Sequence, residues 1–200
     1  MKTMGILGGM ACESTVTYYN VINDYVNQAL GDHHSARCIL YSVEFQDIID
    51  VHRTGNWARA DEILSDAGLP LIHIADVTAD RLLADGVKKV GLLGTKFTME
   101  MDFYKQRLID RGLEVLIPDE AARGEIYRII DTELAFGDIR EDSRAIYQAE
   151  IQKLKERGAQ GVILGCTEIG LLIQQEHSVL PVYDTALIHA EESAKYALAD

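Results

Sequence analysis

Two stretches of the sequence, MGILGGM at residues 4–10 and VGLLGTK at residues 90–96, share an apolar run that leads into a turn. A second matched pair follows in the same order, LPLIHIADVTADRLLADG at 69–86 and LPVYDTALIHAEESAKYALAD at 180–200. Two matched pairs in one order indicate an internal repeat, and chance similarity among apolar strands is the weaker explanation. The sequence therefore predicts two related halves.

Short apolar runs alternate with amphipathic segments along the whole chain. The run 3–9 indicates a buried strand, because it ends in two glycines, and Ser14 can cap the helix that continues to Gly31. Strands that alternate with helices are typical of a parallel sheet with helices on both faces. We expect further strands at 36–45, 69–76, 88–95, 113–117, 161–166 and from 180, and further helices at 56–67, 77–85, 99–111, 123–135, 141–157 and up to 199.

The predicted fold class is therefore α/β, with two similar doubly wound, flavodoxin-like parallel-sheet domains. With 200 residues and 48% hydrophobic content, the chain is long enough for one large domain or two small ones. We place the first domain at residues 1–95, with the C-terminal helix 186–200 packing back on it. The second domain then covers residues 96–185.

The two halves differ in length between their matched stretches. The interval is 64 residues in the first half and 89 in the second, so the first half is shorter by about 25 residues. In the second half this interval holds GAQGVILGCTEIG at 158–170, whereas the first half passes from Gly68 directly into Leu69. The sequence predicts that the first domain lacks a βα segment, the counterpart of the strand that leads to Cys166. Ligands of doubly wound sheets bind beyond the carboxyl ends of the strands, so the gap falls at the functional edge.

Composition and charge argue against several classes of function. The chain has 32 acidic and 19 basic residues and a net charge of -13, whereas a nucleic-acid or anionic-membrane surface needs a basic patch. No apolar run approaches the roughly 18 residues that span a bilayer, and no stretch has the pattern of a signal peptide, so we expect a cytoplasmic protein with a small-molecule substrate. Three widely spaced cysteines without a CxxC pair indicate neither disulfides nor a metal site. Without GxGxxG or GKS/T, a nucleotide cofactor is poorly supported.

Cys166 is the strongest candidate for chemistry. It ends the predicted apolar strand GVILGC at 161–166, and the polar residues Thr167 and Glu168 come directly after it. Its sulfur should therefore lie at the carboxyl edge of the sheet beside a helix start, where the helix dipole favours a thiolate. Two alternatives remain open at this point: a small packed core cysteine, and a Glu168 that serves only as a helix-start carboxylate.

Other polar residues follow the predicted strands at the same edge. Asp184 and Thr185 come after the last strand, and His189 lies one helical turn later, where an imidazole could bind a ligand or tune the cysteine. His73 has a similar place in the first half, but within the predicted strand, where a packed histidine is the better interpretation. Three further sets are candidates for anion binding: the turn with Gly9 and Met10, the equivalent turn with Thr95, Lys96 and Thr98, and the loop residues His52 and Arg53. For the loop residues, a solvated surface is an equally good interpretation.

The residues LGGM with EST at 13–15, GCTEIG at 165–170 and LPVYDTALIHA at 180–190 resemble the aspartate/glutamate racemase family. The resemblance covers nearly the whole chain, and GCTE followed by LPVYDT at this spacing is specific. It implies two similar α/β domains that face each other across a cleft, no cofactor and a homodimer. The implied reaction interconverts the enantiomers of an acidic amino acid, aspartate or glutamate.

Racemisation at Cα needs one group that removes a proton from one face and another that delivers a proton to the opposite face. In the family these are usually two thiols, one in a CNT segment of the first domain and one in GCTE. By resemblance Cys166 is the second thiol, Thr167 and Glu168 bind or orient the substrate, and His189 supports the thiol. Gly9, Met10 and Thr98 are implied to lie along the substrate cleft.

The sequence departs from the family where the first thiol should be, because the CNT-bearing segment is missing. Cys12 is a weak substitute, since the geometry is not built for it. Two other functions remain open: a relative that binds an acidic amino acid without racemising it, and a one-thiol enzyme that resembles arylmalonate decarboxylase. The second would need an apolar pocket where this sequence has GCTE.

Overall fold

The computed structural model describes residues 1–8, 12–44, 46–47, 50, 54 and 72–199, with only the backbone of Cys12 and Glu13. The chain divides into two compact units, Met1–Ile72 together with Ala190–Asp200, and His73–His189. The boundary therefore lies at residue 72, not at residue 95 as the sequence pattern suggested. The reason is that the strand at 89–93 lies inside the sheet of the second unit and pairs there on both sides.

The first unit contains a parallel βαβ arrangement. Strand β1 (Met4–Gly8) leads into helix α1 (Cys12–Leu30), and β2 (Cys38–Ser42) returns beside β1 in parallel register. A small core joins α1 to the C-terminal helix α10 (Thr185–Leu198), because Ile22 packs with Ala190 and Ala194. The segment from Ala190 onward therefore belongs to the first unit.

The second unit is built on a four-stranded parallel sheet. The strand order is β4 (Glu114–Leu116), β3 (Lys89–Leu93), β5 (Gly161–Leu164) and β6 (Val182–Asp184). Every residue of β5 is buried, as expected for a strand with neighbours on both edges and helices on both faces. The parallel arrangement brings the carboxyl ends of β3, β5 and β6 to one edge of the sheet.

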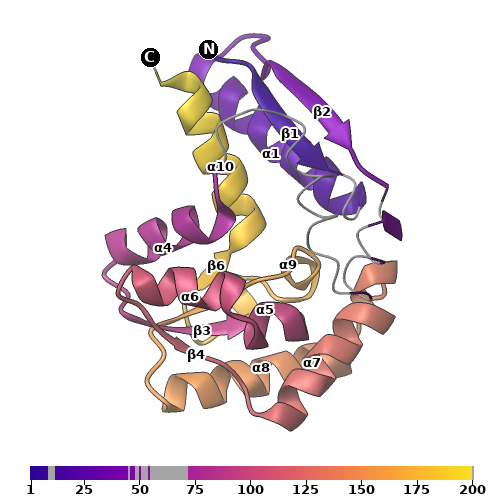
Figure 1. Ribbon diagram of the computed structural model, residues 1–200, viewed down its shortest axis with the longest axis vertical. Coiled ribbons are helices and arrows are strands. Elements are labelled where there is room, and N and C mark those ends of the chain that lie inside the picture. Colours follow the sequence, from indigo (N-terminus) through magenta and orange to yellow (C-terminus); the bar gives the residue numbers. More distant parts are fainter. Residues whose placement is uncertain (9–11, 45, 48–49, 51–53, 55–71, 200) are drawn as a thin grey trace. The chain divides into compact units, whose positions relative to one another are not determined.

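Helices cover both faces of this sheet. Figure 1 shows α4 (Ile74–Ala84) and α6 (Asp102–Asp110) on one face, and α8 (Glu141–Glu156) with α7 (Glu120–Thr132) on the other. A Cβ on Gly91 of β3 would lie 2.8 Å from Leu154 Cδ1, so the glycine lets α8 approach the strand. The second unit is doubly wound, as the sequence predicted. Its shorter helices are α5 (Lys96–Glu100), η1 (Leu134–Phe136), α9 (Ile169–Leu172) and η2 (Gln175–His177).

The strand predicted at 69–76 is wrong in its last part. Residues 69–71 lie outside the described residues, but α4 already begins at Ile74. The His73 side chain accepts a hydrogen bond from the N–H of Ala75 at 3.1 Å and so caps the helix. A short apolar run does not by itself distinguish a strand from a buried helix. Here the cap at His73 favours the helix.

The single helix predicted at 99–111 is two helices. Thr95 caps α5, and Met101 interrupts the helical path with an extended backbone, φ -84° and ψ 155°, before α6 begins. The apolar spacing continues through the break, which is why the sequence pattern did not show it. The helix predicted at 56–67 and the gap between Gly68 and Leu69 lie outside the described residues.

Candidate active site

The ends of three strands are tied together where Cys166 leaves the sheet. β5 ends at Leu164, two residues before Cys166, so the cysteine lies just past the strand and not within it as predicted. The backbone N–H of Gly165 donates to the carbonyl of Leu93 at 2.7 Å. The Thr185 hydroxyl, which is buried, donates to the carbonyl of Leu164 at 2.9 Å. These bonds fix the backbone just before Cys166 from the two neighbouring strand ends.

Thr98 packs against the strand end that leads to Cys166. A Cβ on Gly165 would lie 3.0 Å from Thr98 Cγ2, and a Cβ on Gly94 would lie 3.1 Å from Thr98 Cβ. The Thr98 hydroxyl lies 3.1 Å from the Thr95 hydroxyl, and the backbone N–H of Thr98 donates to Thr95 Oγ1 at 3.2 Å. The two glycines thus allow a buried threonine to approach the Cys166 loop.

Cys166, Thr167 and Glu168 form one hydrogen-bonded cluster. The Cys166 thiol donates to Glu168 Oε2 at 2.7 Å, and the Thr167 hydroxyl donates to the same oxygen at 3.0 Å. Cys166 also packs against the main core of the second unit and is half-buried. The polar residues of GCTE are therefore brought together around the sulfur.

The surroundings of Cys166 do not favour the thiolate that the sequence pattern suggested. Burial raises the pKa of the Cys166 thiol well above its usual value, and the Glu168 carboxylate raises this pKa further, through its charge and its hydrogen bond. Backbone hydrogen bonds at Glu168 and Thr167 act in the opposite direction but do not outweigh these effects. The following helix has only four residues, so its dipole is small. These surroundings favour the protonated thiol.

Asp184 and Thr185 occupy the adjoining strand end, as predicted. Asp184 Oδ1 accepts hydrogen bonds from the N–H groups of Ala186 at 2.9 Å and Leu187 at 3.2 Å, so it caps α10. Burial raises the pKa of the Asp184 carboxyl, an effect that these two bonds oppose. A Cβ on Gly170 would collide with Asp184 Oδ2, which places this carboxylate beside the helix that follows Cys166.

His73 and His189 interact with each other, although one is the first and the other the last residue of the second unit in the sequence. Burial lowers the pKa of His73, the positive charges of Arg107 and His189 lower it further, and Asp76 acts in the opposite direction. Both histidines are half-buried. The structure therefore brings His73, which the sequence analysis treated as a packed strand residue, close to a predicted site residue.

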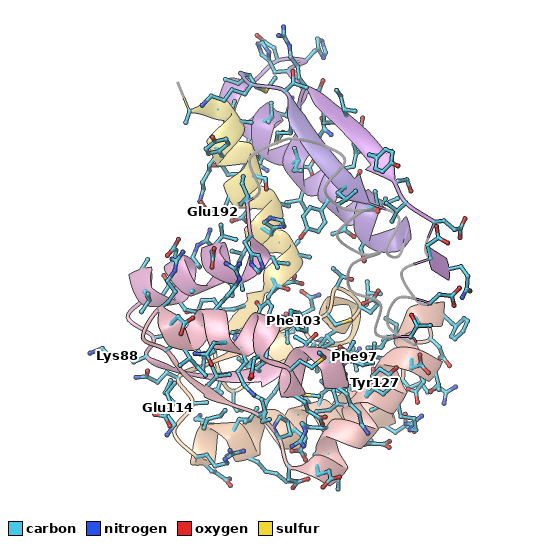
Figure 2. All side chains as sticks on the ribbon, in the orientation of Figure 1. Lys88, Phe97, Phe103, Glu114, Tyr127 and Glu192 are labelled. Carbon is cyan, nitrogen blue, oxygen red and sulfur yellow. The ribbon has the colours of Figure 1, made fainter. Side chains whose placement is uncertain are left out.

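The contacts that hold α5 in place could not be seen in the sequence pattern. Phe97 of α5 meets Tyr127 of α7 in an edge-to-face contact with ring centroids 6.4 Å apart, and Figure 2 shows both rings. The Arg123 guanidinium donates to Glu100 Oε1 at 2.8 Å between the same two helices. Because Thr95 and Thr98 lie at the start of α5, these contacts position two candidate residues. Tertiary contacts of this kind leave no pattern in the sequence.

Tyr147 of α8 was also missed. It is fully buried, and its hydroxyl donates to the carbonyl of Ile126 at 3.3 Å. Burial raises the pKa of Tyr147, and ionisation of Cys166 would raise it further, so the phenol lies near the thiol. Its helical spacing is that of an ordinary core residue, so the sequence pattern did not indicate a place near Cys166.

Three predicted substrate-binding residues, Gly9, Met10 and His52, lie outside the described residues. Within the described ranges, no group of three or more His, Cys, Asp or Glu side chains could hold a metal ion. In the same part of the chain, no helix is long and apolar enough to cross a membrane.

Comparison with known proteins assigns the family. The model of the Asp/Glu/Hydantoin racemase family matches residues 60–193, which include the whole Cys166 cluster. The chain belongs to this racemase family. Membership of this family supports racemisation of an amino acid as the general activity. The protein is therefore an isomerase that acts on a small amino-acid substrate.

Solved structures agree with this racemase-family assignment. A candidate Asp/Glu racemase from Yersinia pestis is 42% identical with a TM-score of 0.92, and the match covers 100% of both chains. An aspartate racemase homologue from Pyrococcus horikoshii is 31% identical with a TM-score of 0.83, again over 100% of both chains. An uncharacterised protein of the pnlA 3′ region in Pectobacterium carotovorum subsp. carotovorum is 30% identical over 111 residues, 56% of this chain and 73% of that protein.

Proposed function

We propose that this racemase-family chain interconverts the enantiomers of an acidic amino acid, aspartate or glutamate, by thiol acid/base chemistry without a cofactor. The observation that carries the proposal is the hydrogen-bonded cluster of Cys166, Thr167 and Glu168 just past the end of β5. A thiol at the carboxyl edge of a parallel sheet lies where ligands of such folds bind. One relative with the same fold is described as a candidate Asp/Glu racemase and another as an aspartate racemase homologue, which supports an acidic substrate.

The proposed roles follow from the contacts around the sulfur. Cys166 exchanges a proton with Cα on one face of the substrate. The hydroxyl groups of Thr98 and Thr167, with Glu168, orient the substrate. Asp184, Thr185 and His189 support the site: Asp184 and Thr185 fix the start of α10, and His189 lies one turn into that helix.

Further parts of the proposal concern residues and properties outside the described site. Gly9, Met10 and His52 contribute to substrate binding in this proposal, through backbone N–H groups of the turn and an imidazole. The protein acts as a cytoplasmic homodimer, as its family resemblance implies. The second acid/base group is the one that the family carries in its CNT segment, which this sequence lacks between Gly68 and Leu69.

A second candidate function is favoured by the short first half. The interval between the repeated stretches is about 25 residues shorter there than in the second half, at the place of the family's first thiol. A chain without the opposed group would bind an acidic amino acid but would not invert it. The alternative is therefore an amino-acid-binding relative with impaired catalysis.

One exchange experiment distinguishes these functions. The purified protein is incubated with each enantiomer of aspartate and glutamate in deuterated water. Loss of the α-proton signal is followed by NMR, and inversion by chiral chromatography. Exchange together with inversion is expected for the racemase, and binding with neither process for the impaired relative. A protein that neither binds nor exchanges these amino acids would contradict both, and would favour decarboxylase chemistry.

Matched variants test the role of the thiol. Cys166→Ser is expected to lower the exchange rate by roughly 10²–10⁴, which is the usual contribution of one general acid or base. Cys38→Ser, in β2 of the first unit, is the control and should leave the rate unchanged. Equal losses in both variants would contradict the assignment of Cys166. Intact-mass measurement of the same preparation, compared with 22.2 kDa, shows whether the short interval is a true deletion.

A further inference from the structure

Glu168 is turned toward Cys166 and not toward the helix that it precedes. It occupies the N-cap position of α9, yet its side chain makes no capping hydrogen bond. Its Oε2 atom accepts from Cys166 Sγ at 2.7 Å and from Thr167 Oγ1 at 3.0 Å instead. The interpretation of Glu168 as a mere helix-start carboxylate therefore does not fit the geometry.

Cys166 and Glu168 share one proton, and its place is on the sulfur. The Sγ atom donates this proton to Oε2 at 2.7 Å, and burial together with the Glu168 carboxylate raises the pKa of the thiol. Loss of this proton would leave a thiolate and a carboxylate in contact at a half-buried position. The phenol of Tyr147, on the neighbouring helix α8, is neutral and adds no compensating charge.

Two further contacts hold this arrangement. The Arg144 side chain of α8 donates from Nε to the carbonyl of Leu172 at 2.9 Å, which fixes the end of α9. On the other side, the N–H of Gly165 is bonded to the carbonyl of Leu93. The backbone is thus anchored before and after the thiol and carboxylate, and their side chains meet between the two anchors.

We propose that Glu168 is a positioning residue that holds the Cys166 thiol through its proton, so that Cys166 is the proton donor of the resting site. The role of Cys166 as a proton donor in catalysis rests on the proposed function. In the reaction, the Cys166 S–H bond breaks as a new Cα–H bond forms on a substrate carbanion, whose α-proton a base has already taken up from the other face. The sulfur is left as a thiolate beside Glu168. A proton taken up from solvent then restores the resting thiol.

Alkylation of Cys166 by iodoacetamide as a function of pH tests the proposal without any substrate. Mass spectrometry of the Cys166 peptide separates its rate from those of Cys12 and Cys38. Because only the thiolate reacts, the midpoint of the pH profile reports the thiol's ionisation, whatever its accessibility. In the wild-type protein we expect a midpoint above the value of about 8.5 for a free cysteine. In Glu168→Gln the midpoint should fall by about one pH unit or more, which makes alkylation near neutral pH about tenfold faster.

Two matched variants separate charge from structure. Glu168→Asp keeps the carboxylate and should keep the midpoint closer to wild type than Glu168→Gln does. Glu176→Gln removes an exposed charge elsewhere and should leave the profile unchanged. A wild-type midpoint at or below that of free cysteine overturns the proposal even if the variants do not fold, and so does a Glu168→Gln profile equal to wild type. Since alkylation needs no turnover, failure of the exchange experiment leaves this result standing.

Discussion

His73 and Asp184 hold the same position in the two repeated stretches, and each caps the helix that follows. Each is the fifth residue of its stretch, in LPLIH and LPVYD. His73 Nδ1 accepts from the N–H of Ala75 at 3.1 Å, and Asp184 Oδ1 accepts from the N–H of Ala186 at 2.9 Å. The repeat seen in the sequence thus corresponds to a repeated start of a helix, with an imidazole in one copy and a carboxylate in the other.

The cap at His73 predicts a graded loss of stability. His73→Ala removes the acceptor of the Ala75 N–H and should lower the free energy of unfolding by about 1 kcal/mol. His73→Asn keeps a capping acceptor and should lose less. Urea unfolding of the three proteins measures both effects. Equal losses in the two variants would mean that packing of the imidazole, and not the cap, supports α4.

His73 also predicts a pH dependence of stability. Its pKa is lowered from 6.5 in the folded protein, by burial first and then by the charges of Arg107 and His189. As the pH falls below about 6.5, the unfolded chain therefore takes up a proton before the folded chain does. The free energy of unfolding should fall over this range and level off below the folded pKa. Urea unfolding near pH 7.5 and near pH 5.5 should show a smaller difference for His73→Asn than for wild type.

We predict that a side chain at Gly170 would cause a steric clash beside the candidate site. A Cβ there would meet Asp184 Oδ2, so Gly170→Ala must displace the carboxylate that caps α10. We expect a loss of about 1–3 kcal/mol in the free energy of unfolding. Gly124→Ala in α7 is the matched control, because nothing lies within 4 Å of its Cβ and alanine should stabilise the helix by about 0.5–1 kcal/mol. Thermal unfolding that ranks the two variants in the opposite order would contradict this geometry.

Glu133 predicts acid sensitivity at the corner between α7 and α8. It is 2% exposed, and its carboxylate accepts hydrogen bonds from the Ser143 hydroxyl and from Arg128 Nη1, the latter at 2.8 Å. Burial acts to raise its pKa, but the bonds from Ser143 and Arg128 and the charge of Arg140 outweigh this effect, and the pKa is lowered from 4.5. The stabilisation is therefore present above pH 4.5 and is lost as the pH falls through the folded pKa.

Ser143→Ala should lower the free energy of unfolding near pH 7 by about 1–3 kcal/mol, because it leaves a buried carboxylate with one hydrogen bond fewer. Glu133→Gln should flatten the loss of stability below pH 4.5, as measured by urea unfolding at a series of pH values. Glu176→Gln, which changes an exposed carboxylate, is the control. An unchanged acid profile in Glu133→Gln would assign the acid sensitivity to other carboxylates.

We predict that the hydroxyl group of Thr98 affects catalysis and that its methyl group affects stability. Thr98→Val removes the hydroxyl proposed to orient the substrate, and should lower kcat/KM by about 2–10-fold, the value of one hydrogen bond. Thr98→Ser keeps the hydroxyl but loses the Cγ2 that packs 3.0 Å from the Cβ position of Gly165, so its main effect should be on stability. Racemisation kinetics and thermal unfolding of both variants test this, and a more active valine than serine variant would contradict the proposed role.

Much of the second unit could be predicted from the sequence. The buried runs at 88–95 and 161–166 correspond to β3 and β5, because continuous apolar segments bounded by glycine are typical of parallel strands. The predicted helix at 141–157 matches α8 within one residue at each end. The helix break at Met101 and the start of α4 at Ile74 could not be predicted, since each depends on a local backbone choice that the apolar spacing does not record.

The sequence by itself determined the α/β class, the doubly wound second unit and the gathering of Cys166, Thr167 and Asp184 at one sheet edge. These follow from periodicity and from the rule that parallel strands end at a common edge. Only the tertiary structure decided the state of the thiol. The sequence pattern favoured a thiolate at a helix start, but burial and the Glu168 carboxylate act at contact distance, where desolvation and charge outweigh the dipole of a four-residue helix.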